Sequence, residues 1–146
     1  MFVRQPEQLG LGHAVLCAER VVGDEPFAVL LAGDFIVAEG AGVTHDLVRT
    51  FETTGKSQLS VMKVEGEDIS KYGVVVPGEI DGSVRGLIGK PKFEEAPFDL
   101  ASIGRYVLTP EVFEILRRQE PAREGKYSSR TRLIKWPQTG EWPRLS

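Results

Sequence analysis

Phe27-Ala28-Val29-Leu30-Leu31 is a continuous apolar run that ends at Ala32-Gly33-Asp34. A short run that is apolar on both faces is typical of a central parallel strand. The periodic stretch from Thr44 to Gly55 predicts a helix, with Thr44 as its N-cap and Gly55 as its C-cap. Alternation from Gln58 to Val64 then predicts a second strand. This strand–helix–strand order indicates an α/β layer fold with right-handed crossovers.

Further elements are expected on both sides of this unit. Apolar spacing from Gly10 to Val22 predicts an amphipathic helix. Thr109-Pro110-Glu111 predicts the start of a helix that runs through Leu116, with Thr109 as N-cap and Pro110 at the first helical position. Three further strands are expected, at 72–76, 84–88 and 103–108. Because ligands bind beyond the carboxyl ends of strands in doubly wound sheets, Gly33-Asp34 is a candidate lip of a site.

Length and composition exclude several classes of protein. The 146 residues suit one domain or part of one, and 41% hydrophobic content is too high for a disordered chain. A net charge of −3 lacks the excess of basic residues that is typical of nucleic-acid-binding proteins, and no apolar run approaches the length of a membrane helix. The lone Cys17 excludes an intramolecular disulfide or a zinc cluster, and Met1 to Pro6 lacks the pattern of a signal peptide. We therefore expect a cytoplasmic protein that binds neither nucleic acid nor membrane.

The charge is distributed unevenly along the chain. Residues 1–122 carry 12 Lys and Arg against 19 Asp and Glu, whereas residues 123–146 carry 6 against 2. Both tryptophans, Trp136 and Trp142, lie in this basic segment. Such a shift indicates a tail or a segment of different origin. A poorly ordered terminus is favoured over a tail that contacts phosphates and stacks on bases.

Several motifs follow one another from about Val3 to about Gly125. They are Arg4-Gln5, Leu9-Gly10-Leu11-Gly12-His13-Ala14-Val15-Leu16-Cys17-Ala18, Val21-Val22-Gly23-Asp24-Glu25-Pro26-Phe27-Ala28-Val29-Leu30-Leu31, Lys71-Tyr72-Gly73-Val74-Val75, Lys90-Pro91-Lys92, Glu95-Ala96-Pro97 and Gly104-Arg105-Tyr106-Val107-Leu108-Thr109-Pro110-Glu111. In this order they resemble the motifs of bacterial UTP–glucose-1-phosphate uridylyltransferases, also called UDP-glucose pyrophosphorylases. The number of independent motifs makes this resemblance more specific than any single glycine-rich signature.

The resemblance implies a Rossmann-like mixed sheet of the sugar-nucleotide transferase type. It also implies the reaction of UTP with glucose 1-phosphate to give UDP-glucose and pyrophosphate, with Mg²⁺. Gln5 and Gly10 match positions that read the uracil edge, and Gly73 matches a backbone contact to glucose. Lys90 matches the lysine that grips the phosphate of the sugar, which makes it the candidate catalytic and sugar-binding cation. His13 lies within the family motif but receives no chemical role.

The departures from the family pattern fall on the chemistry. Where the family has Leu-Pro-Asp, with an aspartate that holds magnesium, this chain has Leu31-Ala32-Gly33. Asp34 follows one position later and is the candidate metal ligand, although a shift of one residue in extended chain reverses the face. Gly89 replaces the glutamate that accepts hydrogen bonds from glucose, which weakens the inference of glucose as the sugar. Phe98-Asp99-Leu100 replaces the usual Ser-Asn-Leu.

Two further parts of the family pattern are not found in this sequence. They are the N-terminal glycine-rich unit that cradles the triphosphate and the C-terminal portion with a second metal-binding aspartate. We therefore expect a partial nucleotidyltransferase domain at 1–122 and an atypical basic tail at 123–146.

A frameshift is one hypothesis for the tail. Residues Gly125 to Leu133 are compatible with the codons GGG-AAA-TAC-AGC-TCA-CGG-ACG-CGA-TTG. From the last base of the first codon they encode Glu-Ile-Gln-Leu-Thr-Asp-Ala-Ile, which is the family motif. Coding DNA that cannot give this motif would remove the hypothesis.

Three functional classes remain open. The first is an active uridylyltransferase, completed by another chain that supplies the glycine-rich loop. The second is a catalytically inactive remnant, and the third is a binding or regulatory module that pairs with an intact transferase through an exposed sheet edge. A homo-oligomer is also open. Gly33, Gly89 and the unmatched loop argue against catalysis by this chain alone. The expected function is uridylyltransferase by descent.

Overall fold

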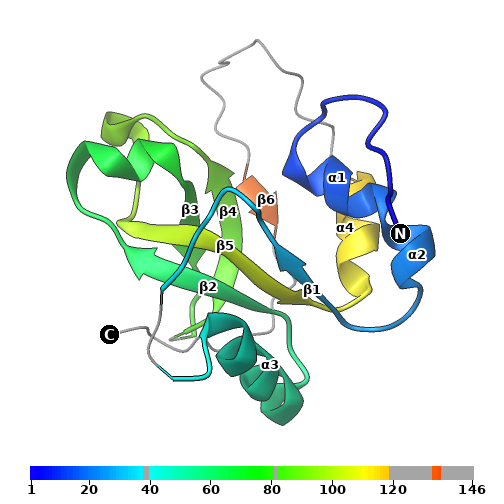
Figure 1. The fold of residues 1–146 in the computed structure, drawn as a ribbon. Coiled ribbons are helices and arrows are strands. Elements are labelled where there is room, and N and C mark those ends of the chain that lie inside the picture. The colour runs from blue at the N-terminus through cyan, green and yellow to red at the C-terminus, as the bar shows by residue number, and fades with distance from the viewer. Residues whose placement is uncertain (38–39, 81, 119–132, 136–146) are drawn as a thin grey trace.

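The computed structural model describes residues 1–37, 40–80, 82–118 and 133–135 (Figure 1). Its strands form one sheet in the order β1-β5-β3-β4-β6, with β2 also paired to β5. The strands are β1 Phe27–Leu30, β2 Gln58–Lys63, β3 Gly73–Pro77, β4 Val84–Gly89, β5 Leu100–Leu108 and β6 Leu133–Lys135. The α/β fold class expected from the sequence is confirmed, and β2 to β5 form where strands were predicted.

β5 is the central strand. Tyr106 and Val107 have register partners in both β1 and β2, and Ala101 and Ser102 have partners in both β2 and β3. Strand β2 therefore lies along one edge of β5, while β1 and β3 share the other. All these pairings are antiparallel.

The prediction that β1 is a central parallel strand is wrong. β1 pairs only with β5 among the described strands, and Leu30 is 56% exposed. β1 and β2 do run in the same direction, but β5 lies antiparallel between them. An apolar run indicates that a strand is surrounded by apolar groups, but it does not indicate which strand pairs with it or in which direction. Here the neighbour of β1 is β5, which lies far along the chain.

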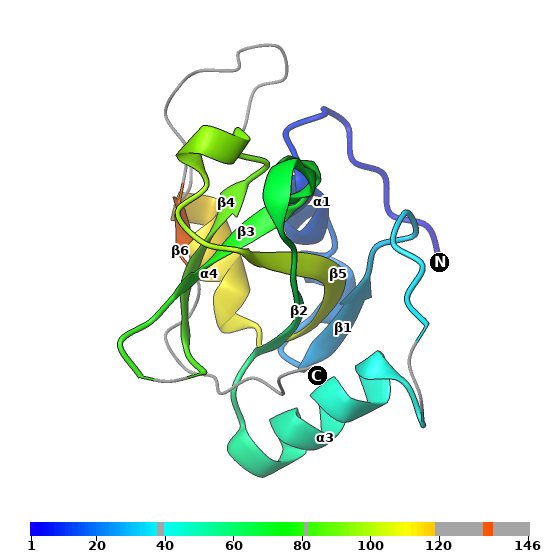
Figure 2. The ribbon, with the colours of Figure 1, turned by 90° about the vertical axis from the view of Figure 1, so that its left-hand side faces the viewer.

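Helix α3, Val43–Thr54, packs on one face of the sheet through Val43, Leu47 and Val107. Figure 2 shows α3 well apart from α1 and α4. Gly55 has the left-handed φ of 67° predicted for its C-cap. The N-cap is Gly42 rather than Thr44, because Val43 is only 7% exposed and burying it starts the helix earlier. The structure also contains two 3-10 helices, η1 (Gly66–Lys71) and η2 (Phe93–Glu95).

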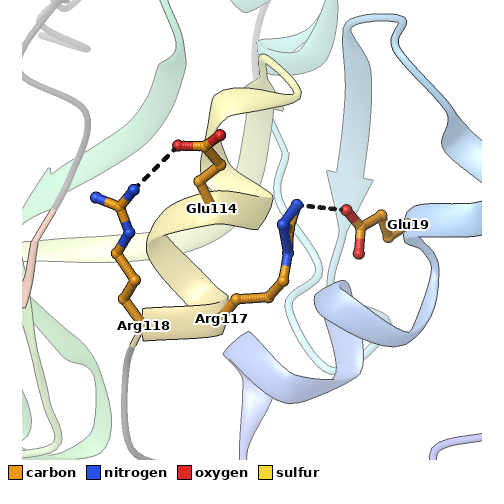
Figure 3. Close-up of polar contacts among 4 residues, drawn as sticks. All are labelled: Glu19, Glu114, Arg117 and Arg118. Carbon is orange, nitrogen blue, oxygen red and sulfur yellow. Dashed lines mark hydrogen bonds and ion pairs between the residues drawn. The ribbon is translucent and has the colours of Figure 1, made fainter.

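Helices α1 (Leu11–Cys17), α2 (Glu19–Val22) and α4 (Glu111–Arg118) pack on the main core cluster. The single helix predicted from Gly10 to Val22 is interrupted at Ala18. Phe113 of α4 stacks on Phe27 of β1 at 5.2 Å, and α1 approaches α4 so closely that a Cβ on Gly12 would lie 2.9 Å from Leu116. Figure 3 shows the ion pair that joins Arg117 of α4 to Glu19 of α2 at 2.7 Å.

The start of α4 differs from the prediction in detail. Helix α4 begins at Glu111, so Pro110 directly precedes it. The Thr109 hydroxyl lies 3.3 Å from Ser57 Oγ, which also accepts a hydrogen bond from the Thr109 backbone N–H. Thr109 therefore ties the end of β5 to the segment that precedes β2.

The predicted tail is described only at β6, which pairs antiparallel with β4. The rest of segment 123–146 lies outside the described residues, and the predictions of a frameshift and of poor order there stay predictions.

Candidate functional site

Arg105 of β5 holds the loop that follows β1. Its Nη1 donates to the carbonyl oxygens of Leu31 at 3.2 Å and Gly104 at 3.0 Å, and its Nη2 donates to that of Asp34 at 2.7 Å. No ion pair joins Arg105 to a carboxylate within the described parts of the chain. The half-buried guanidinium thus uses its donors to fix the backbone of this loop.

The Asp34 side chain lies directly over Gly104. Gly104 has a φ of 72°, and a Cβ built on it would collide with Asp34 Oδ2 and lie 2.9 Å from Asp34 Cγ. The register between β2 and β5 shifts here, and Ser60 Oγ bonds both the N–H and the carbonyl oxygen of Arg105. A glycine at this irregularity therefore lets a carboxylate rest on the surface of the central strand.

Tyr106 lies buried on β5, two residues after Gly104. Its hydroxyl lies 2.8 Å from Ser102 Oγ. Burial raises the pKa of Tyr106; the Ser102 hydrogen bond opposes this rise and the negative charge of Asp34 adds to it. The Asp34 carboxylate is thus close enough to Tyr106 to affect its ionisation. Ser102 is in turn the register partner of Gly73.

Gly73 and Gly89 are directly opposite each other on β3 and β4, and Lys90 follows at once. A Cβ on Gly73 would meet only Ile88 O at 3.9 Å, and one on Gly89 would meet nothing within 4 Å. Neither the backbone nor the neighbours therefore require glycine at these two positions. Lys90 is exposed, has a left-handed φ of 41° and forms no ion pair with the described residues. A non-glycine residue in this region is uncommon and is often found at functional sites.

Gln5 and Gly10 are also in contact with each other. Gln5 Nε2 lies 3.0 Å from Gly10 O and 3.0 Å from His13 Nδ1. Gly10 is the N-cap of α1 and has a φ of 90°, which favours glycine. His13, which sequence reasoning left without a role, therefore belongs to this group.

The predicted site residues thus fall into two groups. Gly73 and Lys90 lie together where β3 pairs with β4 and form one group, while Gln5 and Gly10 form the other; Asp34 lies apart from both, over Gly104 of β5. Among the described residues, no hydrogen bond or ion pair joins Gly73 or Lys90 to Gln5 or Gly10. Two open hollows, of about 440 and 420 Å³, are lined by other residues.

Within the described segments, no three His, Cys, Asp or Glu side chains come together as a metal site would need. No described helix is long and apolar enough to cross a membrane.

Sequence reasoning missed His13, Arg105 and the contact of Asp34 with Gly104. The signals were present, because His13 follows Gly10 by three residues and Gly104-Arg105-Tyr106 was part of the resemblance. The role of Arg105 nevertheless depends on contacts with residues that lie 71 to 74 positions earlier in the chain.

Comparison with known proteins supports the resemblance. The family model described as "Nucleotidyl transferase" matches residues 1–134. A UTP–glucose-1-phosphate uridylyltransferase of Pseudomonas aeruginosa is 40% identical over 95% of this chain and 51% of its own length. The enzyme of the same name from Staphylococcus epidermidis is 47% identical over 82% of this chain and 42% of its own length.

Solved structures agree. A crystal structure of UDP-glucose pyrophosphorylase complexed with UDP-glucose has a TM-score of 0.75 and 39% identity, covering 83% of this chain and 47% of that one. A UTP-bound enzyme of this kind from Acinetobacter baumannii has a TM-score of 0.64 and 34% identity, covering 83% and 45%. The chain thus spans about half the length of the relatives it matches. Because one family model matches residues 1–134, the chain belongs to the nucleotidyl transferase family.

Proposed function

We propose that this chain carries part of the substrate site of a UTP–glucose-1-phosphate uridylyltransferase, with uridine nucleotide and glucose 1-phosphate as its ligands. The observation that carries the proposal is the row formed by Gly73, Gly89 and Lys90. Gly73, a glycine that the fold does not require, leaves backbone open to a sugar, and Lys90, which has no ion-pair partner among the described residues, directly follows the residue opposite Gly73. The named activity of the relatives supports the same ligands.

In the proposed reaction a phosphate oxygen of glucose 1-phosphate attacks the α-phosphorus of UTP. A new O–P bond forms, the bond from that phosphorus to the oxygen that bridges to the β-phosphate breaks, and pyrophosphate leaves with the electron pair. Lys90 would hold the attacking phosphate and reduce its charge repulsion with the triphosphate. Gln5 and Gly10 would hold the uracil, and Gly73 would approach the sugar.

Magnesium is the proposed cofactor, held through Asp34. Mg²⁺ is usually bound by one or two carboxylates together with substrate phosphates and water. The half-buried Asp34 carboxylate fits this donor set, whereas the described residues offer no three-ligand cluster for a metal enclosed by protein. When bound, the ion would neutralise phosphate charge. Asp34 itself would be kept in place by Gly104 beneath it and by Arg105 at its backbone.

We propose that the chain alone turns over slowly, if it does so at all. Gly33 stands where the family has its aspartate and Gly89 where it has its glutamate, so two acidic groups of a preorganised site are absent from these positions. We place the protein in the cytoplasm, since its named relatives are enzymes of nucleotide-sugar chemistry.

A module that pairs with another transferase chain is the second candidate function. The edge of β1 away from β5 has no strand beside it among the described residues, and Leu30 on β1 is 56% exposed. Such an edge can accept a strand from a partner or a second copy. Native mass spectrometry of this chain, alone and mixed with an intact uridylyltransferase, tests both assemblies. A monomer in both samples would remove this candidate.

Isothermal titration with UDP-glucose, with and without magnesium, tests the main proposal. We expect saturable binding that Lys90→Ala weakens about tenfold or more, the loss of a hydrogen bond to a charged group. Lys92→Ala is the matched control, because Lys92 is also exposed and lies two residues away. Asp34→Asn is expected to remove the magnesium dependence. No saturable heat at millimolar ligand on a folded chain, or equal effects of both lysine variants, would reject the proposal.

A further inference from the structure

The orientation of the Gln5 amide follows from its neighbours. One terminal atom of this side chain lies 3.0 Å from Gly10 O and 3.0 Å from His13 Nδ1. A backbone carbonyl oxygen can only accept a hydrogen bond, so the Gln5 atom that faces it must be the NH₂ nitrogen. The side-chain carbonyl oxygen, Oε1, therefore lies on the other side of the amide.

The same geometry fixes the tautomer of His13. An amide nitrogen can only donate, so His13 Nδ1 must accept the second proton of the Gln5 NH₂ group. The imidazole is then neutral and carries its proton on Nε2. Cys17 Sγ lies 4.0 Å from both ring nitrogens, so it singles out neither of them.

Gln5 thus presents only an acceptor to a ligand. Both amide protons are used by Gly10 and His13, and within the described part of the chain nothing donates to Oε1. Without the His13 contact, one amide proton would be unused and the Gly10 carbonyl oxygen alone would hold the amide in this orientation. We propose that His13 is a positioning residue that holds the Gln5 carbonyl oxygen toward the base and so selects uracil over cytosine.

The selection rests on the proposed function, in which Gln5 reads the base. Uracil carries a proton on N3 and can donate to Gln5 Oε1, whereas N3 of cytosine carries a lone pair and would face it as a second acceptor. A site built for one hydrogen-bonding pattern rejects a ligand that leaves its polar group unpaired. We expect UDP to bind about tenfold more tightly than CDP, the effect of one neutral hydrogen bond of ordinary strength.

The first experiment needs no nucleotide. Long-range ¹H–¹⁵N correlation spectra of the chain distinguish the two neutral imidazole tautomers, and His45→Gln assigns the signals to His13. We expect a protonated Nε2 and an unprotonated Nδ1. A proton on Nδ1 at neutral pH would overturn the inference, whatever the chain binds.

The second experiment measures the ratio of the dissociation constants for CDP and UDP by ligand-observed NMR titration. His13→Leu removes one of the two acceptors that orient the amide and should lower the ratio. His13→Asn, whose side-chain oxygen can lie near the position of Nδ1, should restore it. Cys17→Ala, a change one turn along the same helix, should leave the ratio at the wild-type value. Amide spectra confirm that each variant folds.

The outcomes separate the two proposals. An unchanged ratio in His13→Leu, or no recovery in His13→Asn, would refute the positioning role while leaving uridine binding intact. If UDP fails to bind the wild-type chain at millimolar concentration, the proposed function fails, and the tautomer spectrum still decides whether His13 orients Gln5.

Discussion

Replacing Gly104 by alanine should destabilise the fold by about 2–3 kcal/mol. A φ of 72° costs an L-residue about 1–2 kcal/mol. The new Cβ would also collide with Asp34 Oδ2 and lie 2.9 Å from Cγ and 3.1 Å from Cβ of Asp34. Turning that half-buried side chain aside adds about 1 kcal/mol. Urea unfolding at neutral pH, followed by circular dichroism, measures the free energy of unfolding directly.

Gly55→Ala separates the two contributions. Gly55 has a φ of 67°, but a Cβ added to it would meet nothing within 4 Å, so this substitution carries the backbone cost alone. Gly104→Ala should therefore cost about 1 kcal/mol more, and most of that excess should vanish in a chain that also carries Asp34→Ala. Equal costs for the two glycines, or an excess that persists without the carboxylate, would refute the position of Asp34 over Gly104.

Three further predictions concern ionisation, the sugar position and the helix contacts. The pKa of Tyr106 is raised, mainly by burial, so folding favours the neutral phenol. The stability that this preference gives is complete below the ordinary pKa of about 10.0 and is lost as the pH rises above it. Tyr106→Phe should therefore lose less unfolding free energy than the wild-type chain in alkaline titrations. Gly89→Glu has room for its side chain and should tighten UDP-glucose binding about tenfold in calorimetry, whereas an unchanged affinity would argue against a sugar at β4. Glu19→Gln should cost less than about 1 kcal/mol, because the Arg117–Glu19 pair is exposed, and a cost that survives 1 M salt in urea unfolding would contradict this assignment.

Local patterns predicted the elements well. The alternation in β2 and the valine-rich run of β3 describe single stretches of chain, so the residues themselves carry the information. The C-cap at Gly55 was predictable for the same reason, since a left-handed residue at a helix end favours glycine. The N-cap at Thr44 was not, because burial of Val43 against Val107 of β5 decided where α3 begins.

The site was predictable only in part. The residues that match family motifs could be named, and the contact between Gln5 and Gly10 spans only five positions. The register that places Gly73 opposite Gly89 and Ser102 requires three strands to meet, and no local pattern states it. The predicted roles of Lys90, Asp34 and the rest stay predictions until ligands are measured.

The sequence by itself determined most of the helices and strands, the family, and the glycines at positions 33 and 89 where the family has acids. Only the tertiary structure decided that β5 lies between β1 and β2, that Arg105 holds the Asp34 loop and that His13 contacts the Gln5 amide. The physical reason is the distance along the chain over which each interaction acts. Periodicity and capping act within a few residues, whereas strand pairing and side-chain hydrogen bonds are satisfied by whichever distant groups packing brings within about 3 Å.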